Sequence, residues 1–184
     1  PRVWSHVAAT WGAGRVSLYI NGVLDASGVY GGVLDTGKAG LVIGCGVTRN
    51  HCFQGMLDDA AIYGRAKNSF EILSGSPLYT PAGSYQSEIK DAGSSSTWQS
   101  MAWTSDESYG KEMAAEQKGL VHLYHLNDEA AGIAKDEKAE NHLNVMGTHS
   151  VPGIFSQARW FASKRGERMI SQAALPELST YTIS

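Results

Sequence analysis

Short segments with alternating side chains, separated by glycine-containing turns, run through residues 4–63. Residues 4–11, WSHVAATW, alternate as an extended strand with two different faces does. Asn21-Gly22 supplies the dipeptide that best fits a two-residue hairpin turn within residues 15–26. The chain also has 21 glycines in 184 residues, which suits frequent tight turns. This spacing predicts an all-β protein with an antiparallel β-sandwich.

Charge and hydropathy argue against two classes of partner. The formal net charge is −3, with 15 Lys and Arg against 18 Asp and Glu, so no basic field is available for a phosphate backbone. Apolar residues make up 42% of the chain, enough for a core, but no apolar run approaches the ~20 residues that span a bilayer. We therefore expect no nucleic-acid partner and no membrane insertion of this segment.

Five motifs follow one another in the first part of the chain. They are WSHVAATW at 4–11, VSLYING at 16–22, LVIG at 41–44, GMLDDAAIY at 55–63 and the helix-like NSFEIL at 68–73. In this order they resemble the C-terminal half of a laminin-G-like jelly roll, a family of the concanavalin A-like lectin and glucanase superfamily. The resemblance implies an antiparallel jelly roll.

A second set of motifs occupies the last part of the chain. It comprises GLVHLYHLNDE at 119–129, NHLN at 141–144, VPGIFSQARWF at 151–161 and LSTYTIS at 178–184. This set resembles the opening half of the same family. The chain carries Ala162-Ser163 where family members have Asp-Gly after the aromatic strand.

The two resemblances divide the chain into three parts. Residues 1–75 resemble the C-terminal half of one laminin-G-like sandwich, and residues 119–184 the N-terminal half of a second. Residues 76–118 are expected to be a connector with two or three short strands. Because the family's middle strands occur in neither half, this order indicates a piece of a longer tandem protein. Each half is expected to leave apolar faces without partners.

Four oxygen-bearing side chains are candidate calcium ligands: Asp58, Asp59, Asp136 and Asn141. Calcium takes several oxygen ligands, and carboxylates that are distant in sequence can meet on the loops of a sandwich. The alternative is structural, with strand-end carboxylates that cap backbone amides and turn carboxylates that face water. Apart from calcium, no cofactor is expected.

Cys45 and Cys52 lie at the end of one predicted strand and the start of the next. Antiparallel neighbours can reach the Cα separation of about 5.5 Å that a disulfide needs, and an extracellular protein would form it. The alternative is two free thiols. A zinc site that adds His51 is disfavoured, because the spacing matches no familiar zinc motif.

Two further histidines, His122 and His125, flank Leu123-Tyr124 in a predicted strand. Strand alternation places them on opposite faces, so they cannot share a metal without a bulge. A structural or surface role is therefore expected for both.

The resemblance implies a non-catalytic module that binds carbohydrate or protein, or acts as a spacer, in a large multi-repeat protein of adhesin type. Its partners would be a glycan or an extracellular protein, together with neighbouring repeats, and its location would be outside or on the surface of a bacterial cell. An enzyme is not expected, because glycosidases need two carboxylates across a cleft and the acidic residues here cluster in turns. Two alternatives stay open: an accessory domain of a glycoside hydrolase, and a filament subunit that assembles by strand complementation.

Overall fold

The computed structural model describes residues 3–32, 40–46, 48–74, 93–95, 97, 112–128, 132–139, 141–162 and 166–184. Most of the predicted connector at 76–118 lies outside these ranges, so its two or three strands stay a prediction.

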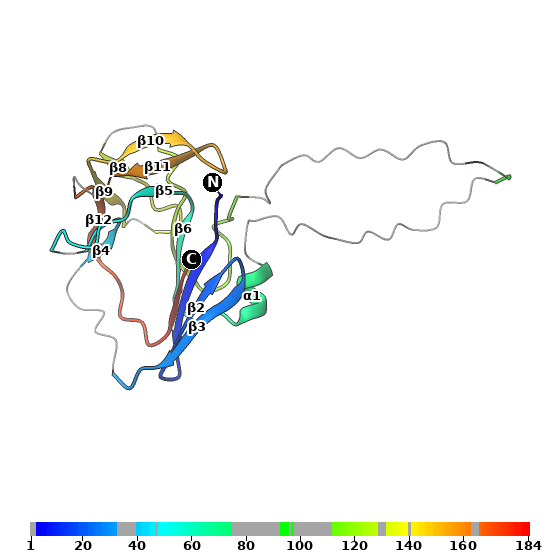
Figure 1. The fold of residues 1–184 in the computed structure, drawn as a ribbon, viewed down its shortest axis with the longest axis horizontal. Helices are drawn as coiled ribbons and strands as arrows, with labels where there is room; N and C mark the ends of the chain where they lie inside the picture. The colour runs from blue at the N-terminus through cyan, green and yellow to red at the C-terminus, as the bar shows by residue number, and fades with distance from the viewer. Residues whose placement is uncertain are drawn as a thin grey trace.

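These residues form β-strands and one short helix (Figure 1). Up to residue 74 the elements are β1 Val7–Gly12, β2 Arg15–Ile20, β3 Val23–Val29, β4 Gly40–Ile43, β5 Gly55–Leu57, β6 Ala60–Tyr63 and α1 Ser69–Ser74. After residue 119 they are β7 Leu120–Tyr124, β8 Ile133–Ala134, β9 Leu143–Met146, β10 His149–Pro152, β11 Gln157–Phe161, β12 Arg168–Ala174 and β13 Tyr181–Ile183. The all-β prediction is confirmed. Within the described part of the chain, no helix has the length and apolar character that crossing a membrane requires.

The strands form three antiparallel sheets. Sheet A has the order β3-β2-β1-β13-β6-β7, sheet B the order β4-β12-β9-β8, and sheet C the order β10-β11-β5. Every sheet takes strands from both the first and the last part of the chain. The two parts, which resemble halves of successive modules, therefore supply each other with strand partners.

Strand β13 is central to this arrangement, because it lies between β1 and β6 although it comes from the far end of the chain. Thr182 pairs with Thr10 on one side and with Tyr63 on the other. Its hydroxyl accepts a hydrogen bond from the backbone N–H of Lys67 at 2.8 Å and donates one to the carbonyl of Arg65 at 2.9 Å. The side chain of Thr182 is fully buried, so β13 is fixed by its side chain as well as by its ladder.

The main hydrophobic core joins all three sheets. It contains the buried residues Tyr124, Leu126, Ala134, Leu143, Phe161 and Met169, against which Leu41, Ile43, Leu57, Ala60 and Val145 pack. The buried residues come from the last part of the chain, and most of those packed against them come from the first. This core is therefore complete only when both parts are present.

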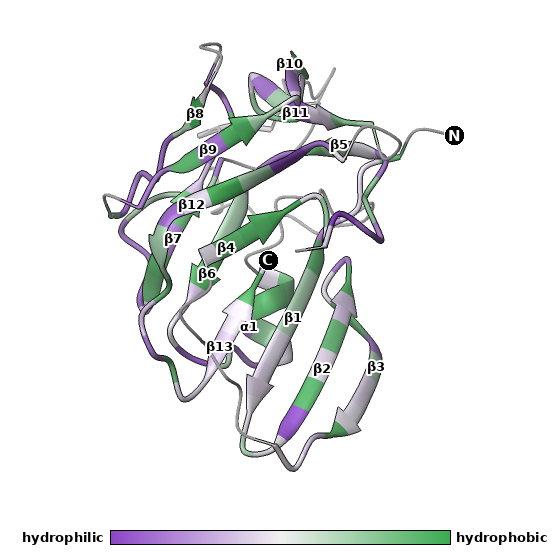
Figure 2. Cartoon of the chain, turned by 90° about the vertical axis from the view of Figure 1, so that its left-hand side faces the viewer, coloured by the Kyte–Doolittle hydropathy of each residue, from purple (hydrophilic) through white to green (hydrophobic). Residues whose placement is uncertain are grey.

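Side chains of β1 alternate between two faces of the strand, as predicted. The face that carries Ala8 is covered by α1. Ala8 packs with Tyr19 and with Ile72 of α1 in a small separate cluster. Val7, on the other face, is 59% exposed, and Leu18 of β2 is 43% exposed. Figure 2 shows β1, β2 and β3 side by side at one end of sheet A, with α1 visible next to β1.

Residues 53–63, which read as one strand in the sequence, are interrupted in the structure. Strands β5 and β6 belong to different sheets, and Asp58 and Asp59 connect them. Asp59 has a φ of +49°, a left-handed conformation that ends the extended run. This break turns the two aspartates inward, toward the last part of the chain.

Candidate functional site

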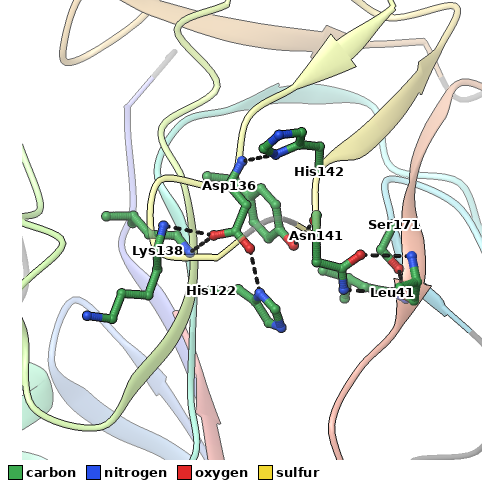
Figure 3. Close-up of polar contacts among 10 residues, drawn as sticks. Leu41, His122, Asp136, Lys138, Asn141, His142 and Ser171 are labelled. Atoms are coloured by element: carbon green, nitrogen blue, oxygen red, sulfur yellow. Dashed lines mark hydrogen bonds and ion pairs between the residues drawn. The ribbon is translucent and has the colours of Figure 1, made fainter.

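Asp136 is buried and uses both carboxylate oxygens within the fold (Figure 3). One oxygen, Oδ2, lies 2.6 Å from Nδ1 of His122. The other, Oδ1, accepts hydrogen bonds from the backbone N–H groups of Leu123 at 3.1 Å and Lys138 at 3.0 Å. The carboxylate thereby fixes the turn after β8 to strand β7.

Asn141 joins two segments through its amide group, beside Asp136 in Figure 3. Its Oδ1 accepts a hydrogen bond from the backbone N–H of Ala173 at 2.8 Å, and its Nδ2 donates to the carbonyl of the same residue at 3.2 Å. Ser171 continues this contact, because its Oγ accepts a bond from the N–H of Leu41 at 2.8 Å. These bonds support the structural alternative for Asp136 and Asn141, while calcium binding there stays a prediction.

Asp58 caps the loop that follows β10. Its Oδ2 accepts hydrogen bonds from the backbone N–H groups of Ile154 at 2.6 Å and Phe155 at 3.3 Å. Its Oδ1 is buried and has no hydrogen-bond partner within the described ranges. Burial raises the pKa of Asp58 to about 6, and the charges of Asp59 and Glu112 add to this effect, against the lowering by the two backbone bonds.

Replacing Asp58 with Asn is expected to increase stability near neutral pH. The folded-state pKa of about 6 exceeds the ordinary 3.8, so the wild-type protein gains stability as the pH falls through 6 toward 4. Asparagine keeps an acceptor for the Ile154 N–H but carries no charge. A shift of this size corresponds to roughly 3 kcal/mol, which partial exposure reduces to about 1–2 kcal/mol.

The measurement is urea unfolding of both proteins between pH 4 and 7.5, with EDTA present to remove metal ions. The stability difference should be largest at pH 7.5 and vanish near pH 4. The exposed Asp25→Asn serves as the matched control and should leave the pH profile unchanged. Parallel profiles for wild type and Asp58→Asn would rule out a buried charged carboxylate at this position.

Asp59 faces two residues from the last part of the chain. Its Oδ1 lies 2.6 Å from Nδ1 of His125, and Oε1 of Glu112 lies 3.4 Å from the same nitrogen. The hydrogen bond to Asp59 raises the pKa of His125, and the negative charges of Asp59 and Glu112 act in the same direction, against the effect of burial. Asn127 donates a hydrogen bond from Nδ2 to Glu112 Oε1 at 2.5 Å.

The four candidate calcium ligands thus have different surroundings in the structure. Asp136 and Asn141 bind neighbouring backbone groups, Asp58 caps a loop, and Asp59 alone meets a histidine and a second carboxylate. The contact of His125 with two carboxylates is not predicted from the sequence. The sequence carries no local signal for this contact, because Asp59 and His125 are 66 residues apart. His122 in β7 contacts Asp136, and His125, directly after β7, contacts Asp59. The two histidines thus contact different carboxylates, which agrees with the prediction that they lie on opposite faces of the strand.

The comparisons with known proteins bear on the first part of the chain. Residues 1–73 match the family model described as the concanavalin A-like lectin/glucanases superfamily, in its laminin-G-like branch. We call residues 1–73 the laminin-G-like segment because of this similarity. No curated protein and no solved structure matches the chain. The match supports a module that binds carbohydrate or protein, and domains of this kind are commonly extracellular.

A disulfide closes a loop within the laminin-G-like segment. Cys45 and Cys52 are bonded, with their Cα atoms 4.0 Å apart. Two backbone hydrogen bonds tighten the loop, from Arg49 N–H to the Gly46 carbonyl at 2.8 Å and from Gly46 N–H to the Asn50 carbonyl at 2.9 Å. The loop therefore fixes the backbone at Arg49.

Arg49 borders an open hollow between the laminin-G-like segment and the last part of the chain. The hollow has a volume of about 350 Å³ and is lined by Arg49, Met146, Gly147, Gly166, Glu167 and Arg168. Glu167 is buried, and its Oε2 accepts a hydrogen bond from the backbone N–H of Ala162 at 2.6 Å. Within the described residues, the guanidinium groups of Arg49 and Arg168 make no hydrogen bond or ion pair.

Proposed function

We propose that this chain is a non-catalytic glycan-binding module of a secreted or cell-surface protein, and that it recognises an acidic sugar. The hollow between Arg49 and Arg168 is the observation that carries this proposal. With two arginines and Glu167, its lining has a net charge of +1. Guanidinium groups bind carboxylates and sulfates through paired hydrogen bonds. A uronate or a sulfated sugar fits this charge, and the apolar Met146 offers a surface for a sugar ring.

The backbone positions of both arginines are fixed before any ligand arrives. Arg49 is positioned by the disulfide-closed loop, and Arg168 pairs with Met146 in the ladder between β12 and β9. A site built on fixed elements loses less conformational entropy when it binds. The disulfide also fits the extracellular location, since disulfides persist in oxidising compartments.

The absence of catalysis is part of the proposal. Glycosidases use two carboxylates, either about 5.5 Å apart or 6.5–9.5 Å apart, on opposite sides of the scissile bond. The lining of the hollow includes one carboxylate, Glu167, and that group accepts a backbone hydrogen bond. A binding role within a larger glycoside hydrolase is compatible with this lining.

Filament assembly would need β13 to pair with β1 and β6 between chains, and here these pairs form within one chain.

The test is a glycan array with neutral, uronate-containing, sialylated and sulfated sugars, followed by titration of the best ligand. Arg49→Ala and Arg168→Ala should each weaken binding by about tenfold, the effect of losing one charge-assisted contact. Arg15→Ala, at an exposed arginine at the start of β2 in sheet A, is the matched control and should bind as the wild type does. Acidic-glycan binding that survives both arginine substitutions would place the site elsewhere, and binding of neutral sugars alone would contradict the proposal.

A further inference from the structure

A cluster of three metal-binding side chains lies away from the hollow, where the laminin-G-like segment meets the last part of the chain. Asp59 lies between β5 and β6, Glu112 precedes β7, and His125 directly follows β7. One donor atom from each of these side chains lies within 4.8 Å of the other two. The three donors therefore already lie close enough to share one ion after small side-chain movements.

A second observation, the burial of an unpaired carboxylate oxygen, favours a cation at this cluster. The Asp59 side chain is only 6% exposed, and its Oδ1 is occupied by His125. Its other oxygen, Oδ2, is buried and has no hydrogen-bond partner among the residues that the structure describes. A buried carboxylate oxygen without a partner is costly, and a cation would remove that cost.

The donor atoms determine the class of ion. Calcium takes six to eight oxygen ligands, and an imidazole nitrogen is a poor substitute for one of them. Zinc and related transition metals take imidazole nitrogen and carboxylate oxygen together, often with three protein ligands and a water molecule. We propose that Asp59, Glu112 and His125 bind one divalent transition-metal ion, with zinc as the representative case.

The surroundings of the cluster support this assignment. Asn127 donates to Glu112 through Nδ2 and accepts the backbone N–H of Gln157 through Oδ1 at 3.0 Å, so it orients the glutamate. Such outer contacts fix the direction of metal ligands. The Glu112 side chain is 37% exposed and provides a path from solvent to the buried aspartate. A bound ion would join the laminin-G-like segment to the strand that follows the connector.

The experiment is isothermal titration of ZnCl₂ into the EDTA-treated and dialysed 184-residue chain, with CaCl₂ in excess. One zinc ion per chain is expected. Glu112→Gln should weaken binding by at least about tenfold, the loss typical of disturbed metal coordination. Because Glu112 is exposed, this variant should fold, which far-UV circular dichroism checks. His125→Gln should abolish binding.

Two matched controls make the same substitutions, glutamate to glutamine and histidine to glutamine, at residues outside the cluster. Glu116→Gln alters a neighbouring exposed glutamate, and His149→Gln alters an exposed histidine on β10; both should bind zinc as the wild type does. Cobalt provides an independent readout, since a four-coordinate Co²⁺ ion at the cluster absorbs strongly in the visible region and this band should be missing in His125→Gln. The proposal is overturned if zinc does not bind, if Glu112→Gln binds it unchanged, or if calcium displaces it.

Discussion

A chain that lacks residues 181–184 is expected to lose its cooperative unfolding transition altogether. The deletion removes β13 from the middle of sheet A and leaves the facing edges of β1 and β6 unpaired. It also removes both backbone hydrogen bonds between Ala61 and Ser184, at 2.7 and 3.0 Å, and the contact between the rings of Trp11 and Tyr181. Unpaired strand edges beside an open core favour aggregation. Circular dichroism during urea unfolding measures the loss of the transition.

A single substitution provides a graded form of this test. Thr182→Val keeps the shape of the side chain but leaves the Lys67 N–H and the Arg65 carbonyl without their partner. We expect a loss of about 2–4 kcal/mol, since each unsatisfied buried group costs about 1–3 kcal/mol. Ser179→Ala, at an exposed residue just before β13, should change stability by less than about 0.5 kcal/mol. A shortened chain that unfolds at the same urea concentration as the full one would show that β13 is not part of the stable fold.

The second large effect is expected at Gly44, which packs against Phe161 from the last part of the chain. Its φ is +96°, and a Cβ added there would lie 2.3 Å from Cε1 of the buried Phe161 and 3.2 Å from the Glu167 carbonyl. Phe161 cannot move freely, because it also contacts the ring of Phe53 edge-on at a centroid distance of 6.2 Å. Gly44→Ala should cost about 2–5 kcal/mol, from the left-handed backbone and from overpacking together.

The measurement is the free energy of unfolding from urea titration. Gly28→Ala is the matched control: nothing lies within 4 Å of the added Cβ, and this variant should differ from wild type by less than about 0.5 kcal/mol. Phe161→Leu introduced together with Gly44→Ala should recover part of the loss, because the smaller side chain gives room to the added methyl group. Equal stability of Gly44→Ala and wild type would mean that these two residues are not in contact.

The elements with local signals could be predicted from the sequence. The Asn21-Gly22 turn joins β2 and β3 as expected, with φ values of +51° and +79°, and the helix-like segment at 68–73 becomes α1. Helix α1 begins with a reciprocal pair of hydrogen bonds, from Asn68 N–H to the Glu71 carboxylate and from Glu71 N–H to Asn68 Oδ1. Each of these features depends on residues within a few positions, so a pattern can reveal it.

The partners of the strands could not be predicted in the same way. Residues 178–184 look β-prone in the sequence, but nothing in them indicates that β13 lies between β1 and β6. The alternation of β1 gives two faces, and the buried one includes Ala8, which packs on Ile72 from a distant part of the sequence. The contact of Asp59 with His125 likewise depends on the pairing of β6 with β7, which places Ala60 opposite Tyr124. Such pairs are set by the whole fold.

The central place of β13 has a consequence for how the molecule is made. On the ribosome, β1 and β6 emerge before β13, and their shared neighbour is absent until Tyr181–Ile183 has been synthesised. Contacts between residues so distant in sequence also slow folding, because a long loop must close before they form. Until β13 has been synthesised, the nascent chain therefore presents two open strand edges to chaperones and to other nascent chains.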